Sequence, residues 1–162
     1  MAHIDITRAP TVGHIWRYAG YDPTCEWKRG EKRPWNASLK VLCWKAGESF
    51  VKVSGKEEAF YGQIYKKQKE KYVAKNLAGG FAETAAATLK KKTWGRDTIA
   101  RAAYESGRLP DGHIHAMAKR YAVKLFLAHL HDRWFRLHFG TEPPKPYPIA
   151  YLDHVHYIAP PE

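Results

Sequence analysis

Residues 111–139 read DGHIHAMAKRYAVKLFLAHLHDRWFRLHF, the longest run of the chain that is both free of proline and rich in apolar side chains. Asp111 directly follows Pro110, and its carboxylate can cap the free N–H groups of a first helical turn. Gly140, with two prolines shortly after it, supplies a stop. The stretch therefore predicts one long helix around which the rest of the chain is organised.

At 100° per residue, this helix is apolar on two sides. One side holds Ile114, Ala118, Tyr121, Leu125 and Ala128, and the other holds Val123, Phe126, Leu130, Trp134 and Leu137. We therefore expect it to pack on both sides. A narrow polar stripe remains, formed by His113, Arg120, Lys124, His131 and His138. A solvated face is the ordinary explanation of such a stripe, and a ridge that faces phosphate groups is the sharper one.

The composition favours one basic domain. With 162 residues and 44% hydrophobic content, the chain can bury the core of one domain. Its 27 Lys and Arg against 16 Asp and Glu give a net charge of +11, which is typical of proteins that meet nucleic acid or an anionic membrane. No run approaches the roughly 20 apolar residues of a membrane span, and the start lacks the layout of a signal peptide. Cys25 and Cys43 form no disulfide framework, so a reducing cytoplasm is the expected location.

The fold class that follows is mostly α, with a single helical domain over residues 1–140 and an extended tail over residues 141–162. The tail holds six of the ten prolines and is expected to wrap over the body. Besides the long helix, helical patterns cover residues 12–18, 36–53, 56–75, 82–91 and 96–106. Thr11 is expected to cap the first of these and Asn36 the second.

A strongly basic loop separates the first two helices. It reads YDPTCEWKRGEKRPW over residues 21–35, and its two prolines and one glycine exclude a helix. Its cations are Lys28, Arg29, Lys32 and Arg33, and Lys40 follows on the next helix. Such a cluster is suited to holding phosphate groups. Ser38, one turn into that helix, carries a hydroxyl that can face a phosphate held there, although a helix-tolerated serine is the ordinary reading.

The pattern over residues 56–75 has two readings. It places Tyr61, Ile64, Tyr65, Gln68 and Tyr72 on one side of a helix, with lysines around the rest. Tyrosines among lysines suit nucleic acid, because rings can stack on bases while ammonium groups hold phosphates. A half-buried helix whose lysines extend their stems over apolar surface gives the same pattern.

The histidines do not predict a metal site. They include three His-x-His pairs, at residues 113 and 115, 129 and 131, and 154 and 156. On a helix, residues two apart point about 200° from each other, so the first two pairs cannot share one ion. Only His154 and His156 lie in the extended tail, and they have no acidic or cysteine partners nearby. No acidic cluster suited to two metal ions is visible either.

The region around the basic loop resembles a known family. The residues Ala19, Gly20, Tyr21, Asp22 and Pro23 form a turn, the basic loop with Gly30 follows, and Asn36, Leu39 and Lys40 open a helix. This order is similar to the C-terminal transposase domain of the DEDD insertion-sequence transposases, the IS-one-ten family, also called bridge-RNA-guided recombinases. The ending, DGHIHAMAKRYAVKLFLAHL with a later LDHVHYIAPP, is similar to the tail of one branch of that family.

The resemblance implies a DNA-binding domain that takes part in transposition. Strand exchange would need a guide RNA, a homo-oligomer, and a RuvC-like domain whose four acidic residues bind Mg²⁺. That domain is absent from this sequence, so the chain looks like a C-terminal fragment or a stand-alone relic. The family's serine nucleophile is expected in the loop after the proline turn, where this chain has Thr24 and Cys25. Ser38 is the nearest serine and is the candidate for a transient phosphoserine link to DNA. Alone, the chain is expected to bind without cutting.

The expected nucleic-acid contacts are Lys28, Arg29, Lys32, Arg33, Lys40, Arg120 and Lys124. A different class of function is a small helical adaptor or inhibitor that binds a protein through its aromatic residues and its proline-rich tail. A third is a metal hydrolase built from the histidines, which would require stoichiometric zinc or iron. Salt separates the first two, because nucleic-acid binding weakens steeply with salt and an aromatic protein interface does not.

Overall fold

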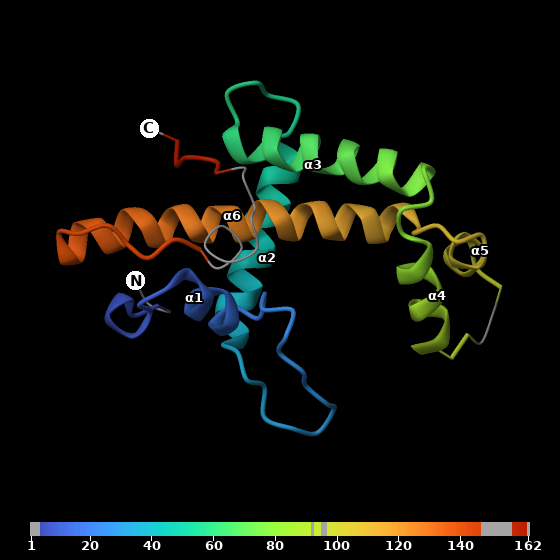
Figure 1. Ribbon diagram of the computed structural model, residues 1–162, viewed down its shortest axis with the longest axis horizontal. Coiled ribbons are helices and arrows are strands. Elements are labelled where there is room, and N and C mark those ends of the chain that lie inside the picture. The colour runs from blue at the N-terminus through green and yellow to red at the C-terminus, as the bar shows by residue number, and fades with distance from the viewer. Residues whose placement is uncertain (1–3, 92, 95–96, 147–156, 162) are drawn as a thin grey trace. The chain divides into compact units, whose positions relative to one another are not determined.

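The computed structural model describes residues 4–91, 93–94, 97–146 and 157–161. The described chain is mostly helical and contains no strand, which confirms the predicted fold class (Figure 1). Its elements are a short 3-10 helix, Ile6–Arg8, and the helices α1 (Val12–Tyr18), α2 (Ala37–Lys52), α3 (Phe60–Leu77), α4 (Ala82–Lys91), α5 (Ile99–Glu105) and α6 (Asp111–Phe139). The long C-terminal helix α6 is present over the predicted residues.

The start of α2 follows its expected signal, whereas the starts of α5 and α6 differ from expectation. Asn36 caps α2, since its Oδ1 accepts a hydrogen bond from the backbone N–H of Leu39 at 2.8 Å. The helix α5 begins later than expected because Thr98 is its N-cap and accepts from the N–H of Arg101. At α6, Pro110 rather than Asp111 takes the capping position. The Pro110 carbonyl accepts from the N–H groups of His113 and Ile114, and Asp111 is the first helical residue.

The chain divides into two compact units. Unit 1 comprises Met1–Ser49 and Ala122–Glu162, and unit 2 comprises Phe50–Tyr121. Helices α2 and α6 both run from one unit into the other. The chain passes from one unit to the other inside these two helices, at residues 49–50 and 121–122. No glycine or proline marks the boundary at either place.

In unit 1, α1 runs antiparallel to the second half of α6. The indole N–H of Trp16 donates to the Lys124 carbonyl at 3.0 Å, and His131 bonds to the Ala9 carbonyl at 2.8 Å. Ala9, before α1, thus pairs with a later residue of α6 than Trp16 does, so the two segments run in opposite directions. Residues from α1, α2 and α6 are buried here: Val12, Ile15, Leu39, Cys43, Val123 and Leu127.

In unit 2, α3 runs antiparallel to the first half of α6. The Tyr65 hydroxyl bonds to His115 at 2.8 Å, and the Asn76 side chain bonds to both backbone groups of Leu109. Helices α4 and α5 pack against each other. The core of this unit consists of Phe81, Ala85, Tyr104, Leu109 and Ile114. None of the helices in the described residues has the length and apolar character needed to cross a membrane.

Candidate nucleic-acid interface

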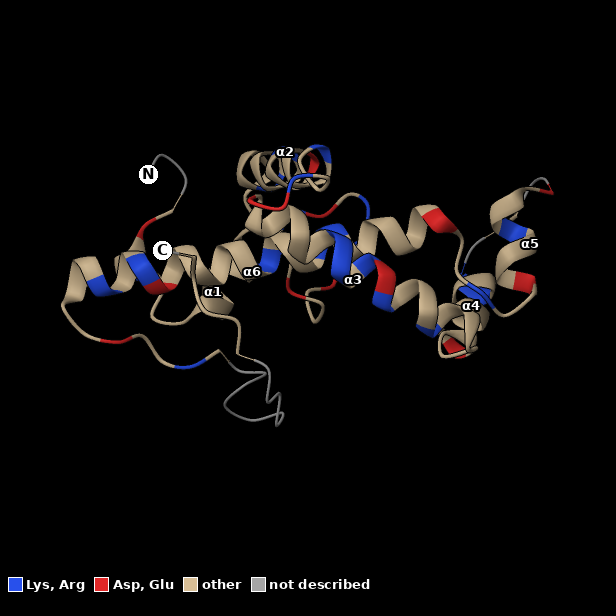
Figure 2. Ribbon diagram, turned by 90° about the horizontal axis from the view of Figure 1, so that it is seen from above, with Lys and Arg blue, Asp and Glu red and all other residues tan. Residues whose placement is uncertain are grey.

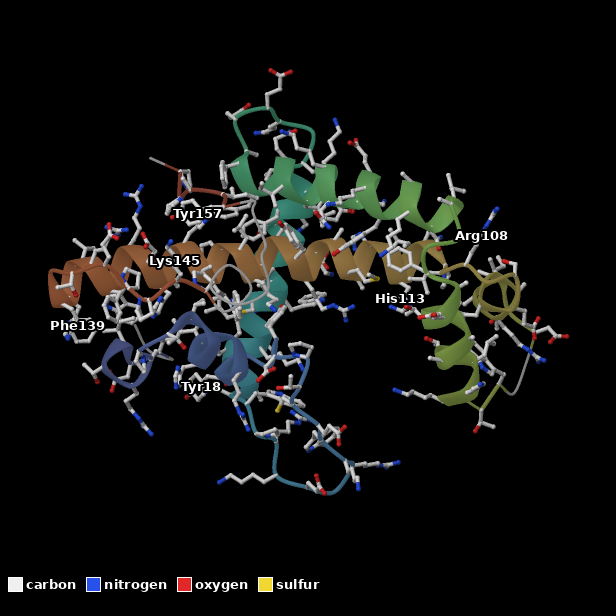
Figure 3. All side chains as sticks on the ribbon, viewed as in Figure 1. Tyr18, Arg108, His113, Phe139, Lys145 and Tyr157 are labelled. Atoms are coloured by element: carbon white, nitrogen blue, oxygen red, sulfur yellow. The ribbon has the colours of Figure 1, made fainter. Side chains whose placement is uncertain are left out.

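The two ends of the loop over residues 21–35 are tied together at Tyr18 and Asn36. The backbone N–H of Asn36 donates to the Tyr18 carbonyl at 2.8 Å, and the Asn36 amide donates to the Tyr18 hydroxyl at 2.9 Å. Tyr18 stands at the end of α1, where the loop departs (Figure 3). Asn36 thus caps α2 and also closes the loop, so the end of α1 and the start of α2 are held together at the base of the loop.

A close approach at Gly20 shapes the base of the loop. Gly20 has φ +72°, and a Cβ on it would lie 3.0 Å from Cγ of Trp35 and 3.1 Å from Cδ of Lys40. The ammonium group of Lys40 lies 4.0 Å from the centre of the Trp35 ring. The predicted phosphate contact Lys40 is therefore held over an aromatic ring at the loop base, and its position depends on a residue without a side chain at position 20.

The outer part of the loop is also ordered by its own contacts. Trp27 packs edge-on against Trp35, with ring centres 5.9 Å apart, and the guanidinium of Arg33 lies 5.8 Å from the Trp27 ring. The Trp27 indole N–H donates to the Glu31 carbonyl at 2.8 Å, and the Glu31 carboxylate accepts from the N–H of Lys28 at 3.1 Å. These contacts hold the backbone between residues 27 and 33.

The four loop cations are exposed and lie within six consecutive residues. Lys28, Arg29, Lys32 and Arg33 all face solvent, and Gly30, with φ +98°, makes the turn between the two pairs. We call these four residues the basic cluster. A set of cations on a loop with a fixed backbone can meet several phosphates of one strand without first ordering the chain.

The two predicted contacts on α6 belong to different units, Lys124 to unit 1 and Arg120 to unit 2. Lys124 is half-buried, with its ammonium group 4.2 Å from the centre of the Trp16 ring. Burial lowers the pKa of Lys124, while the carboxylate of Asp22 raises it. Arg120 is exposed but belongs to unit 2. Lys124 is thus placed as part of the packing around α1, and its role at a phosphate stays a prediction.

Ser38 is exposed on the first turn of α2. Within the described part of the chain, no histidine or carboxylate is hydrogen-bonded to its hydroxyl. Attack by a serine needs a base or a metal ion to take up its proton. Its proposed role as a nucleophile therefore stays a prediction, which depends on groups that the described residues do not place beside it.

The polar stripe on α6 is neither a solvated face nor a ridge along its whole length. His131 is only 2% exposed, and its Nε2 donates to the Ala9 carbonyl. His113 is hydrogen-bonded to Tyr104 at 3.0 Å. A neutral imidazole with a carbonyl partner can be buried at low cost, and for this reason His131 joins the core instead of the surface.

In each of the first two His-x-His pairs, the two histidines form hydrogen bonds to different partners. His129, on the other side of α6 from His131, bonds to the carbonyl of Ile158 at 2.8 Å. His113 and His115 bond to tyrosines from α5 and α3. Residues two apart on a helix point in nearly opposite directions, so each pair fastens two separate segments.

Burial of His131 predicts a loss of stability in acid. Burial lowers the pKa of His131 below its ordinary value of 6.5. The unfolded chain therefore takes up the proton first, so the stabilisation is complete above pH 6.5 and is lost as the pH falls toward the pKa of the folded state. Between these values, His131 contributes a slope of at most about 1.4 kcal/mol per pH unit to the free energy of unfolding.

A His131→Gln variant tests this effect, because its amide N–H can still donate to Ala9 but does not titrate. Urea unfolding between pH 7.5 and 5 should show a smaller loss of stability in this variant than in the wild type. The matched control is His138→Gln, since His138 is exposed on the last turn of the same helix. Equal pH dependence in the wild type and in both variants would contradict the assignment.

On α3, the half-buried reading is confirmed for its central tyrosine. Tyr65 is 5% exposed, and Tyr72 packs edge-on against Phe81 with ring centres 6.0 Å apart. Lys75 extends over the Phe81 ring at 4.8 Å. Tyr65 is therefore not free to stack on a base, and Tyr72 is partly buried against the core of unit 2.

The sequence reading missed how the charge is distributed. Unit 2 holds fifteen Lys and Arg against seven Asp and Glu, and unit 1 holds twelve against nine. Lys and Arg recur along α3 (Figure 2). It also missed Trp16 and Trp35 as platforms under lysines. Lys40 follows Trp35 by five residues, so the sequence itself indicates that the two can meet. Lys124 is far from Trp16 in the sequence, so nothing in the sequence indicates their contact.

The described residues contain no group of three or more His, Cys, Asp or Glu side chains that could hold a metal ion. His154 and His156 lie outside the described residues. Burial raises the pKa of the Cys43 thiol to about 11, so that thiol stays protonated and is a poor metal ligand.

Comparison with known proteins adds no relative. No family model matches the chain, and no curated protein or solved structure is similar to it. The resemblance to the IS-one-ten transposases therefore depends on the residues quoted for it, chiefly the turn at residues 19–23, the basic cluster and the helix start at Asn36.

Proposed function

We propose that this chain is a nucleic-acid-binding domain of a DNA transposase, and that the basic cluster holds the phosphate backbone. One observation carries the binding proposal. Four exposed cations, Lys28, Arg29, Lys32 and Arg33, lie on one loop whose ends are tied at Tyr18 and Asn36. The net charge of +11 gives the whole chain a favourable field for a polyanion.

The order of the loop makes these cations more effective than mobile ones. Packing of Trp27 on Trp35 and the hydrogen bonds of Glu31 restrict the backbone before any ligand arrives. Less conformational freedom is then lost on binding. Phosphate contacts of this kind fix position and register but carry no sequence information, so the basic cluster gives affinity and not target choice.

The transposase part of the proposal is supported by the resemblance of residues 19–40 and of the C-terminal stretch. In that setting this chain supplies the DNA contact, and strand exchange uses a guide RNA, a homo-oligomer and an acidic, Mg²⁺-binding domain. Ser38 is the candidate nucleophile within such an assembly, in the reducing cytoplasm. The chain by itself is then a binding protein without cleavage activity.

The test replaces the four cations of the basic cluster by glutamine. We expect this variant to bind a duplex DNA probe at least tenfold more weakly than the wild type near 0.1 M salt, because each lost phosphate contact also abolishes a counterion release. Fluorescence anisotropy of a labelled duplex measures this change. The glutamines keep long side chains on the loop, and circular dichroism checks that the helices are intact.

The matched control removes the same charge from unit 2. Lys66, Lys67, Lys90 and Lys91 are all exposed, and glutamine preserves helix propensity on α3 and α4. We expect a threefold loss or less from this control. Equal losses in both variants would show that net charge alone binds DNA, and the basic cluster would lose its assigned role.

A further inference from the structure

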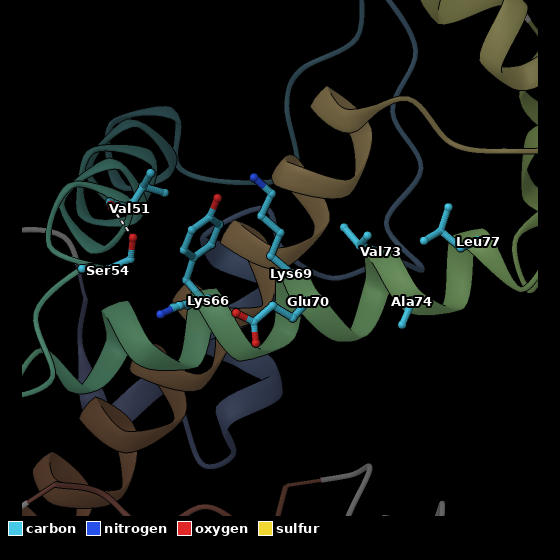
Figure 4. A pocket seen from close by; sticks show the side chains of 10 residues that line it. Val51, Ser54, Lys66, Lys69, Glu70, Val73, Ala74 and Leu77 are labelled. Atoms are coloured by element: carbon cyan, nitrogen blue, oxygen red, sulfur yellow. Dashed lines mark hydrogen bonds between the residues drawn. The ribbon is translucent and has the colours of Figure 1, made fainter.

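Unit 2 has a groove between the end of α2 and α3. Its volume is about 660 Å³, and its lining includes Val51, Lys66, Lys69, Val73 and Leu77 (Figure 4). Lys69, Val73 and Leu77 point to the same side of α3 in this view. No residue of the basic cluster takes part, so the groove is separate from the proposed phosphate contact.

A glycine brings the two walls of the groove together. Gly62 on α3 is buried, and a Cβ on it would lie 3.0 Å from Cα of Ser54 and 3.1 Å from the Val53 carbonyl oxygen. The amide of Gln63 donates to the carbonyls of Ser54 and Lys56, at 3.2 Å and 2.7 Å. The groove is therefore set by backbone contacts and exists before any ligand binds.

The wall formed by α3 is apolar toward its C-terminal end and cationic toward its N-terminal end. Residues 66, 69, 73 and 77 follow the spacing of three and four that defines one face of a helix. Val73 is 37% exposed and Leu77 is 62% exposed. Between positions 66 and 77, α3 rises about 16 Å, or three turns.

The charge around the groove is strongly positive. Along α3, Lys66, Lys67, Lys69, Lys71 and Lys75 stand against a single acid, Glu70. Among the described residues, Lys66 and Lys69 take part in no ion pair. Unit 2 as a whole carries eight more basic than acidic residues. An occupant with carboxylates beside its apolar side chains would match this surface in both respects.

We propose that this groove binds an amphipathic helix of another polypeptide, with apolar anchors on Val73 and Leu77 and acidic residues beside Lys66 and Lys69. Recognition of a helix in a groove uses anchors at i, i+4 and i+7, which fit a wall of three turns. A second copy of this chain is a poor occupant, because its own unit 2 is also basic. Base stacking by a single-stranded nucleic acid is disfavoured because the one aromatic residue in the lining, Tyr65, is 5% exposed and offers no face to a base.

The experiment uses the full chain and a panel of labelled helical peptides of about 15 residues, long enough for three turns. Each peptide has leucines at i, i+4 and i+7 flanked by glutamates, with the acidic part at either end so that both orientations are covered. A second panel replaces the glutamates by lysines. Anisotropy gives the dissociation constants, and a labelled single-stranded oligonucleotide is the competing probe.

Two pairs of variants separate the two halves of the site. The double variant Val73→Gln with Leu77→Gln removes the anchors. Its control is the double variant Ile99→Gln with Leu137→Gln, because these two side chains are 91% and 86% exposed. We expect the acidic peptide to bind at least tenfold more weakly to the first variant and unchanged to the control. Lys66→Glu with Lys69→Glu should transfer the preference to the lysine peptides, whereas Lys90→Glu with Lys91→Glu should not.

The proposal is overturned if no acidic peptide binds below about 1 mM, which corresponds to only about 4 kcal/mol. It is equally overturned if each double variant binds the peptides with the same dissociation constants as its control. A third outcome is that the oligonucleotide displaces the peptide and that its own binding is lost in Lys66→Glu with Lys69→Glu but kept in Val73→Gln with Leu77→Gln. That outcome would show that the groove binds phosphate groups and not a helix. The basic cluster is unchanged in all these variants, so the result is independent of the proposed DNA contact.

Discussion

An Asn76→Ala variant is expected to lose about 2–4 kcal/mol of unfolding free energy, because two buried backbone groups would each lose their partner. The Asn76 amide donates to the Leu109 carbonyl at 2.9 Å, and its oxygen accepts from the Leu109 N–H at 2.8 Å. Leu109 is 2% exposed, so water cannot readily replace either bond. The pair holds the chain against α3 just before α6 begins.

Urea unfolding followed by circular dichroism measures this loss. Gln68→Ala is the matched control, because Gln68 is a partly buried amide on the same helix and makes no hydrogen bond to another described residue. We expect its effect to be below about 1 kcal/mol, as for most substitutions away from buried networks. A loss below 0.5 kcal/mol in Asn76→Ala would contradict the assigned bonds.

Gly20→Ala is expected to cost about 2–4 kcal/mol, the sum of a backbone cost and a steric one. The backbone cost arises because φ is +72°, and the steric cost because the new Cβ would lie 3.0 Å from Trp35 and 3.1 Å from Lys40. Moving Trp35 also disturbs Trp27, which packs on it. We therefore expect weaker DNA binding and a change in tryptophan fluorescence in the folded variant.

Gly30→Ala is the control for the steric part. Gly30 also has a positive φ, +98°, but nothing lies within 4 Å of the position that its Cβ would take. Only the backbone cost remains, about 1–2 kcal/mol. If urea titrations give the same loss for both alanine variants, and both leave the tryptophan fluorescence unchanged, the close contact at Gly20 is refuted.

The sequence predicted those elements whose signals are local. The bounds of α6 follow from an uninterrupted periodic stretch between Pro110 and Gly140, and the cap of α2 from Asn36. For α3, lysines around tyrosines fit both a half-buried helix and a nucleic-acid contact, and the sequence alone does not decide between them. The buried Tyr65 bonds to His115, which is 50 residues away.

The errors and omissions concern contacts between distant residues. The helical periodicity places His131 on a polar stripe, but its partner is the Ala9 carbonyl, 122 positions earlier. Trp16 and Lys124 are separated by 108 positions. The groove of unit 2 depends on how closely Gly62 approaches Ser54, which no periodic pattern encodes. The basic cluster, in contrast, was visible as composition alone.

The slope of log affinity against log salt tests the central claim most directly. Duplex DNA binding by the wild type and by the glutamine variant of the basic cluster would be titrated between 0.05 and 0.3 M NaCl. Four phosphate contacts predict a slope about 3–4 units steeper for the wild type than for the variant, at about 0.9 per contact. Equal slopes for both proteins, or a wild-type affinity independent of salt, would contradict the claim that this loop holds the phosphate backbone.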